Sequence, residues 1–406
     1  MITWHREDDT LGHGGWINRF IERRSQEDHD KRRCADLAGR WGSAVQALGL
    51  TKDTMSNVGI PGLAAPRIIH IAFDGAVERF TVRMLPGQLI DQYRDLTREL
   101  CEALGVAGLT FRRRTHGVLI VELLRHDPIE SIVDLPTLIS GNADEVLVGM
   151  LGSGDRLTVN LRSLAHILVQ GQTRSGKSRW VYGWLSQLAK ASNVRISGSD
   201  VTGILLRPLR NTKHDEHLAL GTKNLEQHAE VLEDLVKSMD ERIERIPEDT
   251  DTLPITEADP YELVVIEELP GLIEAAENLD SQRKAQKLPP IAPRLRGAYG
   301  RLLAEGAKVG FRVLIIMQRA DASIIGGFQR GQATLRISFP VADPGSVKML
   351  HSQVDDATAD AHTLGQPGRA LVSGPGIPVQ RLRAPHMGDY AAFRDNVRVQ
   401  LESVPA

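Results

Sequence analysis

The most constraining feature of this chain is the octapeptide GQTRSGKS at residues 171–178. It has the required residue at every fixed position of the phosphate-binding pattern G-x-x-x-x-G-K-[ST]. The apolar residues 166–169 precede it and the helix-compatible residues 179–189 follow it, which is the strand–loop–helix context of a P-loop. We therefore predict a nucleotide-binding loop formed by Gly171, Gln172, Thr173, Arg174, Ser175, Gly176, Lys177 and Ser178.

The chemistry of such a loop predicts ATP and Mg²⁺ as cofactors. Backbone N–H groups enclose the phosphates, and the helix N-terminus adds partial positive charge. Lys177 would reach the β- and γ-phosphates, and the Ser178 hydroxyl would be a ligand of Mg²⁺.

A second acidic site is expected at the end of a buried strand. The apolar residues 263–266 are followed by Glu267 and Glu268. We predict that Glu267 supports the metal at the Walker B position and that Glu268 orients the attacking water. The alternative is a strand that ends in two solvated carboxylates. Asp is usual at the first position, so Glu267, together with Arg174 in the loop, predicts slower turnover.

A polar amide follows another apolar run. Gln318 comes after residues 313–316, so it is either a sensor of the γ-phosphate or a cap on a strand edge. A strand and a helix separate the P-loop from Glu267, which indicates the RecA-like branch rather than small GTPases. The predicted fold class is α/β, with a RecA-like P-loop ATPase core of the ASCE branch.

The pattern along the chain predicts three regions. Residues 1–60 are predicted as a helical segment, residues 66–130 as a small α/β domain and residues 145–390 as the motor domain. The small domain has the order strand, strand, helix, strand, strand, at residues 67–73, 79–84, 86–104, 108–112 and 117–122. The motor has apolar runs at 166–169, 194–196, 263–266 and 313–316, separated by long helical stretches, which is typical of a parallel sheet.

Composition limits the location and the partners. The 406 residues include two cysteines, 41 % hydrophobic residues and no run of about 18 apolar residues, so we expect a cytoplasmic protein without a transmembrane segment of its own. The net charge of −3 argues against a surface that binds nucleic acid throughout. Local basic loops remain possible contact sites.

These motifs, in this order, resemble the FtsK/SpoIIIE family of DNA-pumping ATPases, especially the soluble motor proteins of actinobacterial conjugative and integrative elements. Residues 263–273 match the family's Walker B strand and following helix. Residues 310–319 are similar to its strand that ends in Thr-Gln-Arg-Pro, residues 335–339 to its Arg-Ile-Ala-Phe segment, and residues 365–373 to its closing Gly-rich turn. The resemblance covers residues 145–385, and residues 66–127 are similar to the small domain that often precedes the motor.

The resemblance implies a homo-hexameric ring that moves double-stranded DNA through its centre. Arg336 would be the arginine finger that reaches a neighbour's γ-phosphate; the alternative is a salt-bridged surface arginine. DNA contacts would come from two basic loops, which are either pore loops or solvated surface: Arg207, Arg210, Lys213, Arg319 and Arg330. The short C-terminal tail implies that DNA polarity is not read by this chain, and membrane recruitment would need a membrane-anchored or transfer-complex partner.

The sequence therefore predicts an ATP-dependent double-stranded DNA translocase, acting in DNA transfer or chromosome segregation. Two alternatives stay open. One is a nucleotide-gated assembly protein that recruits partners and does not translocate. The other is a secretion-type ATPase that acts on polypeptide.

Overall fold

The chain forms two compact units, Met1–Glu130 and Ser131–Ala406. A computed structural model describes residues 3–5, 16–55, 61–74, 77–130, 132–134, 141, 143–320, 326–374 and 376–398. Among these residues, no helix is both long and apolar enough to cross a membrane.

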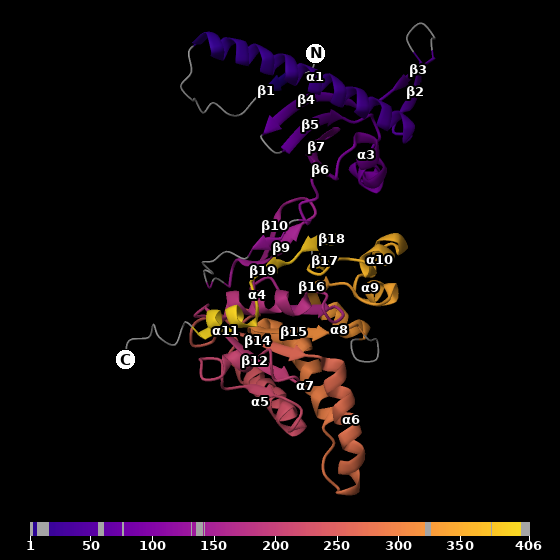
Figure 1. Ribbon diagram of the computed structural model, residues 1–406. Helices are drawn as coiled ribbons and strands as arrows, with labels where there is room; N and C mark the ends of the chain where they lie inside the picture. The colour runs from indigo at the N-terminus through magenta and orange to yellow at the C-terminus, as the bar shows by residue number, and fades with distance from the viewer. Residues whose placement is uncertain are drawn as a thin grey trace. The chain divides into compact units, whose positions relative to one another are not determined.

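A ten-stranded sheet organises the larger unit (Figure 1). Its order is β10-β9-β18-β17-β16-β11-β15-β14-β12-β13, and the six strands from β16 to β13 are parallel. The remaining four extend the sheet in antiparallel fashion. The strands are β9 (Val146–Leu151), β10 (Arg156–Val159), β11 (His166–Gln170), β12 (Val194–Asp200), β13 (Leu218–Leu220), β14 (Tyr261–Glu267), β15 (Phe311–Met317), β16 (Ala333–Ser338), β17 (Arg369–Gly374) and β18 (Ile377–Arg383). A separate short pair consists of β8 (Val133–Asp134) and β19 (Pro385–His386).

Helices cover both faces of this sheet, because the parallel strands are apolar on both sides. Along β11, Ile167 and Val169 join one core cluster with Trp180 and Trp184, whereas Leu168 joins a second cluster on the other face. The first cluster holds α4 (Lys177–Ala189) and α11 (Tyr390–Arg398); the second holds α5 (Leu225–Ile243), α6 (Leu269–Ala285) and α7 (Ala292–Glu305) (Figure 1). Shorter elements are η1 (Arg207–Leu209), η2 (Gly306–Val309), α8 (Gly327–Gln332), α9 (Pro344–Leu350) and α10 (Asp356–Thr363).

The four predicted central strands are present as β11, β12, β14 and β15, each longer than its apolar run by one or more residues. The sheet places β15 between the P-loop strand β11 and the acidic strand β14. The carboxyl ends of all three strands therefore meet at one edge, where Gln318 follows β15. The predicted α/β class is confirmed. The strand that precedes Gln318 lies beside the P-loop strand, which is the arrangement that a sensor of the γ-phosphate requires.

The smaller unit contains a five-stranded sheet of order β1-β4-β5-β7-β6. Its strands are β1 (Thr3–His5), β4 (Arg67–Asp74), β5 (Val77–Arg83), β6 (Gly108–Thr115) and β7 (Val118–Leu124), and a separate ribbon pairs β2 (Lys52–Met55) with β3 (Pro61–Ala64). The helices are α1 (Trp16–Ala47), α2 (Ile90–Asp95) and α3 (Thr97–Leu104). The predicted single helix over 86–104 is thus two short helices.

The structure differs from the predicted division between residues 1–60 and 66–130. Leu37, Trp41 and Val45 of α1 are buried in one core with Ile71 and Phe80 of the sheet. The indole of Trp41 also donates a 3.0 Å hydrogen bond to the carbonyl of Pro66. These residues recur every four positions and form a helical stripe that needs an apolar partner, so α1 and the sheet share one core.

Candidate nucleotide-binding site

The P-loop connects β11 to α4 in a conformation that its glycines permit. Gly176 has φ +98°, and a Cβ atom there would lie 2.5 Å from the backbone nitrogen of Gly368. A Cβ on Gly171 would lie 2.6 Å from Ser175 Oγ. Because neither position has room for a side chain, the two glycines of the motif are steric requirements of this turn.

Distant parts of the chain hold the loop in place. The amide of Gly171 donates to the carbonyl of Met317, and the amide of Gln172 donates to that of Pro340. The amide of Gly368 donates a 2.8 Å bond to the carbonyl of Ser175. The Gly-rich segment near residue 368 therefore braces the P-loop from outside the motif.

Lys177 begins α4 and points to the carboxyl end of β15. Its Nζ donates a 2.8 Å hydrogen bond to the carbonyl of Met317. Burial lowers the pKa of Lys177, while the negative charges of Glu268 and Glu267 oppose that shift. The negative charges of both glutamates thus act on the ammonium group. Its present hydrogen-bond acceptor is an uncharged carbonyl, which a phosphate oxygen can replace.

Glu268 occupies a strained position between β14 and α6. Its φ of +54° lies in the left-handed region that residues with a side chain rarely adopt. Its amide donates a 2.8 Å hydrogen bond to the carbonyl of Ile316, which holds this turn against β15. Burial raises the pKa of Glu268. Such strain is typical of residues whose side chain must be aimed at a site.

Glu267 does not stand alone, because Asp200 lies opposite it. The two residues end β14 and β12 and are paired in register. Thr202 Oγ1 lies 2.7 Å from Glu267 Oε2 and 2.8 Å from Asp200 Oδ1. A hydroxyl has one proton, so two such bonds require a second proton on the carboxyl pair.

The proton belongs on Glu267. Both carboxyl oxygens of Asp200 already accept 2.9 Å hydrogen bonds from backbone amides, Oδ1 from Gly203 and Oδ2 from Leu206. Burial, and then the neighbouring Asp200, raise the pKa of Glu267 above the usual range for a carboxyl group. A protonated Glu267 can donate to Thr202, and Thr202 can then donate to Asp200.

These groups line one cavity of about 570 Å³, within the range of small-molecule sites. The structure brings together the P-loop, both glutamates and Gln318, as the sequence predicts. The lining also contains residues that the sequence did not indicate. The residues that line the cavity include Gln172, Thr173, Arg174, Ser175, Gly176, Lys177, Ser178, Tyr182, Thr202, Glu267, Glu268, Gln318 and Pro367. Gly171, the first residue of the motif, is buried and does not line the cavity.

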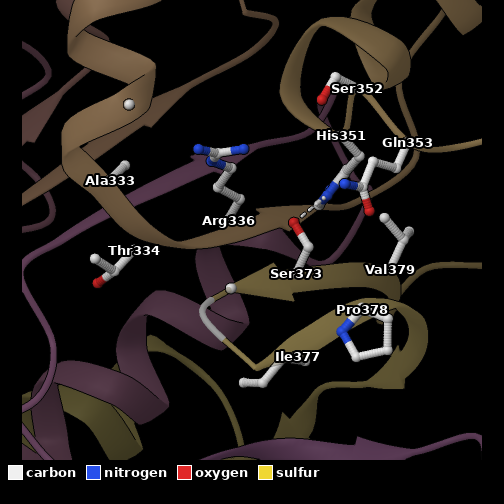
Figure 2. A pocket seen from close by; sticks show the side chains of 12 residues that line it. Ala333, Thr334, Arg336, His351, Ser352, Gln353, Ser373, Ile377, Pro378 and Val379 are labelled. Atoms are coloured by element: carbon white, nitrogen blue, oxygen red, sulfur yellow. Dashed lines mark hydrogen bonds between the residues drawn. The ribbon is translucent and has the colours of Figure 1, made fainter.

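Arg336 lies in a different pocket (Figure 2). This pocket has a volume of about 240 Å³ and contains none of the P-loop residues. Arg336 Nη2 donates a 2.8 Å bond to the carbonyl of Arg330, and burial lowers the pKa of its guanidinium. Figure 2 shows His351 and Ser373 beside it, joined by a 2.8 Å hydrogen bond. Arg336 is therefore not among the residues that line the P-loop cavity of its own chain.

The predicted DNA-contact residues do not line the cavity, and they differ in exposure and in hydrogen bonding. Arg207, Arg210, Lys213 and Arg319 are exposed, and Arg330 is half-buried. Arg207 donates to the carbonyl of Gly203, and Arg330 donates to that of Met349. Lys213 binds the carbonyl of Ala191, and burial lowers its pKa. Residues 321–325 of the predicted loop between Arg319 and Arg330 lie outside the described residues.

With this geometry established, comparisons with known proteins identify the fold. Residues 142–278 match the sequence model of the FtsK/SpoIIIE family. The predicted resemblance to the FtsK/SpoIIIE family is confirmed. Transfer protein TraSA of Streptomyces ambofaciens is 26 % identical over 379 residues, which cover 86 % of this chain and 87 % of that protein.

The second similar protein is DNA translocase SftA of Bacillus subtilis (strain 168). It is 24 % identical over 359 residues, which cover 82 % of this chain but 34 % of that protein. The chain thus spans about a third of the length of that FtsK/SpoIIIE-type translocase. Among solved structures, the pCW3 conjugation coupling protein TcpA, in its monomer form with ATPgS, has a TM-score of 0.58 at 18 % identity, covering 90 % of this chain and 99 % of that chain.

The fold is therefore that of a RecA-like P-loop ATPase, as predicted. The P-loop and the family match show nucleotide use. The residues that sequence reasoning missed are Asp200 and Thr202. The run at 194–196 indicated the strand, but three small residues, Ser197 to Ser199, separate that run from Asp200.

Proposed function

We propose that this chain is an ATP-driven translocase of double-stranded DNA that acts in DNA transfer or chromosome segregation. One observation supports ATP hydrolysis: Lys177, Glu268 and Gln318 line the same cavity. Gln318 follows β15, which lies between the P-loop strand β11 and the acidic strand β14. The DNA substrate is supported by the names of the similar proteins, a conjugative transfer protein and DNA translocases.

The proposed reaction divides its work among this chain's own residues. The P-loop amides and Lys177 bind the phosphates, and the Lys177 ammonium stabilises charge that develops on the γ-phosphate. The Glu268 carboxylate accepts a proton from the attacking water and orients it. Gln318 adjoins both this cavity and a neighbouring cavity lined by Arg319, so it can report the state of the γ-phosphate to that surface.

The site fits Mg²⁺, which prefers oxygen ligands and keeps several waters. Ser178 and Glu267 supply a hydroxyl and a carboxylate within the same cavity, and Asp200 with Thr202 holds Glu267 from behind. Mg²⁺ would neutralise charge on the β- and γ-phosphates. To bind it, Glu267 must release the proton that it shares with Thr202 and Asp200.

The shared proton predicts a pH dependence. Because Glu267 keeps its proton above the ordinary carboxyl pKa, the affinity for Mg²⁺–ATP should rise with pH, by up to about tenfold per pH unit for one released proton. The variant Asp200→Asn removes the negative charge that opposes ionisation, so its rise should occur at lower pH. Titration of a fluorescent ATP analogue across pH measures this, and binding in EDTA is the control. Superimposable profiles for the two proteins would refute the shared proton.

The assembly in this proposal is a homo-hexamer around DNA. Arg336 is compatible with it, since Arg336 lines a pocket separate from the P-loop cavity and in a ring would contact the nucleotide of a neighbouring subunit. Four of the five predicted DNA-contact residues are exposed: Arg207, Arg210, Lys213 and Arg319. Arginines of this kind bind phosphate without reading bases. A membrane-anchored or transfer-complex partner belongs to the same proposal.

Displacement of a triplex-forming strand from duplex DNA tests the motor. We expect ATP-dependent displacement by the wild-type protein and none by Lys177→Ala, which loses the phosphate contact. Binding of duplex DNA and ATP without displacement would instead identify a nucleotide-gated assembly protein. ATP hydrolysis that polypeptide stimulates and DNA does not would identify a secretion-type ATPase.

A further inference from the structure

Five arginines gather at one end of the sheet in the smaller unit; we call them the arginine edge. They are Arg67, Arg83, Arg112, Arg113 and Arg114, and all five residues are exposed. Arg67 begins β4, Arg83 ends β5, and the other three lie in the last part of β6. Neither the nucleotide cavity nor the proposed motor mechanism uses any of them.

The strand register brings these residues to the same end. Arg67 is directly opposite Arg83, Arg83 is opposite Val118, and Val118 is opposite Thr115. The amide of Met84 donates a 2.9 Å bond to the carbonyl of Gly117, which ties the β6–β7 turn to the end of β5. Since β4, β5, β7 and β6 are successive neighbours, the edge spans about 14 Å at the usual spacing of about 4.8 Å between strands (Figure 1).

Charge in this unit is segregated rather than simply abundant. Residues 61–130 contain nine arginines and nine carboxylates, so the segment is neutral overall. The helices α2 and α3 carry Asp91, Asp95, Glu99 and Glu102. On the sheet, Glu78 and Glu122 are buried and already bonded to arginines. The arginine edge is therefore a local excess of positive charge.

Repulsion between neighbouring arginines destabilises this edge, and a bound anion would reduce that repulsion. Like charges directly opposite each other on neighbouring strands, such as Arg67 and Arg83, are destabilising. Among the described residues, no carboxylate forms an ion pair with Arg67, Arg83, Arg113 or Arg114. Arg112 alone has such a contact, 3.7 Å from Glu122.

We propose that the arginine edge binds the phosphate backbone of double-stranded DNA, as a second DNA contact outside the motor domain. The inference rests on the proposed function, which supplies duplex DNA as substrate. Its span of about 14 Å is close to the about 12 Å width of the major groove, so arginines at its two ends can contact phosphates on both sides of one groove. Such contacts position the duplex without reading its sequence.

The distribution of apolar side chains favours DNA over an anionic membrane. Among the described residues of this unit, the exposed large apolar side chains are those of Met55 and Leu63 on the β2–β3 ribbon and of Leu89 in the turn before α2. None is in the four strands that carry the arginine edge. A surface that offers guanidinium groups without exposed large apolar side chains among them matches a phosphate backbone better than a lipid interface.

Salt-dependent DNA binding by the full chain tests the proposal. Each lost phosphate contact lowers the slope of log K against log salt concentration by about 0.9. We expect the double variant Arg113→Ala/Arg114→Ala to reduce the slope by about 1.8 relative to wild type, and Arg67→Ala/Arg83→Ala to do the same. The matched control, Arg94→Ala/Arg98→Ala on α2 and α3, removes equal charge and should leave the slope unchanged.

The outcomes separate this inference from the proposed function. Wild-type binding to duplex DNA with unchanged slopes in both edge variants would overturn the arginine edge and leave the motor intact. Equal losses in the edge variants and the control would also overturn it, because bulk charge would then explain the effect. Loss of binding to vesicles with anionic lipid, with no change in DNA binding, would assign the edge to a membrane. No duplex binding by the wild-type protein would defeat the proposed function itself.

Discussion

Replacement of Arg336 by alanine should reduce ATP hydrolysis by about 10³- to 10⁵-fold, the range known for arginine fingers. The reason is that transition-state charge on the γ-phosphate would lose its guanidinium partner. ATP binding should be nearly unchanged, since Arg336 lines a pocket without P-loop residues. Steady-state hydrolysis and equilibrium binding of a fluorescent ATP analogue measure the two effects separately.

Mixing two inactive variants tests whether Arg336 acts on a neighbour. Lys177→Ala subunits lack the phosphate contact but keep Arg336, and Arg336→Ala subunits have the opposite defect. If the site forms between chains, the mixture contains some interfaces with both groups intact and should recover measurable hydrolysis. Recovery would not occur if both residues served the same chain's nucleotide.

A control variant separates a catalytic role from a general loss of charge. Arg156 lies exposed on the edge strand β10, so Arg156→Ala should retain wild-type hydrolysis. Full activity of Arg336→Ala would make Arg336 a structural residue that binds the carbonyl of Arg330. That result would remove the support that this residue gives to the ring.

The sequence predicted the parts of the site that are contiguous in the chain. The P-loop is one octapeptide, and Glu267 and Gln318 come one and two residues after the apolar runs at 263–266 and 313–316. Glu267, Glu268 and Gln318 could be placed because parallel strands put their carboxyl ends at a common edge. Local pattern and one geometric rule were sufficient for these residues.

The sequence could not predict contacts that depend on which strands are neighbours. Asp200 faces Glu267 only because β12 lies beside β14. In the sequence, 66 residues separate the two. The brace between Gly368 and Ser175 likewise joins segments that share no pattern. In the smaller unit, the stripe of Leu37, Trp41 and Val45 indicated a buried helix face but not the sheet that covers it.

The variant Glu268→Gln should lower ATP hydrolysis by about 10²- to 10⁴-fold while ATP binding is retained. Glutamine fills the same volume and keeps the backbone, but it cannot accept a proton from water. Binding should persist because the phosphate contacts come from the P-loop and Lys177. Single-turnover hydrolysis and ATP-analogue affinity are the two measurements.

The backbone at Glu268 sharpens this prediction. A backbone φ of +54° favours glycine or asparagine, so a glutamate at this position has a conformational cost of about 1–3 kcal/mol. The amide of Glu268 donates a hydrogen bond to the carbonyl of Ile316. This bond holds the Glu268 backbone at the carboxyl end of β15, beside the P-loop. The strain therefore has a function only if the carboxylate itself is needed.

Two comparisons distinguish that function from a role in folding. Glu274→Gln, on the exposed side of α6 in the neighbouring cavity, should hydrolyse ATP at the wild-type rate. Glu267→Gln should instead weaken the dependence on Mg²⁺, because Glu267 is proposed to support the metal rather than the water. Wild-type turnover by Glu268→Gln would contradict this role and assign the orientation of the attacking water to another polar group of the cavity, such as Glu267 or Gln318.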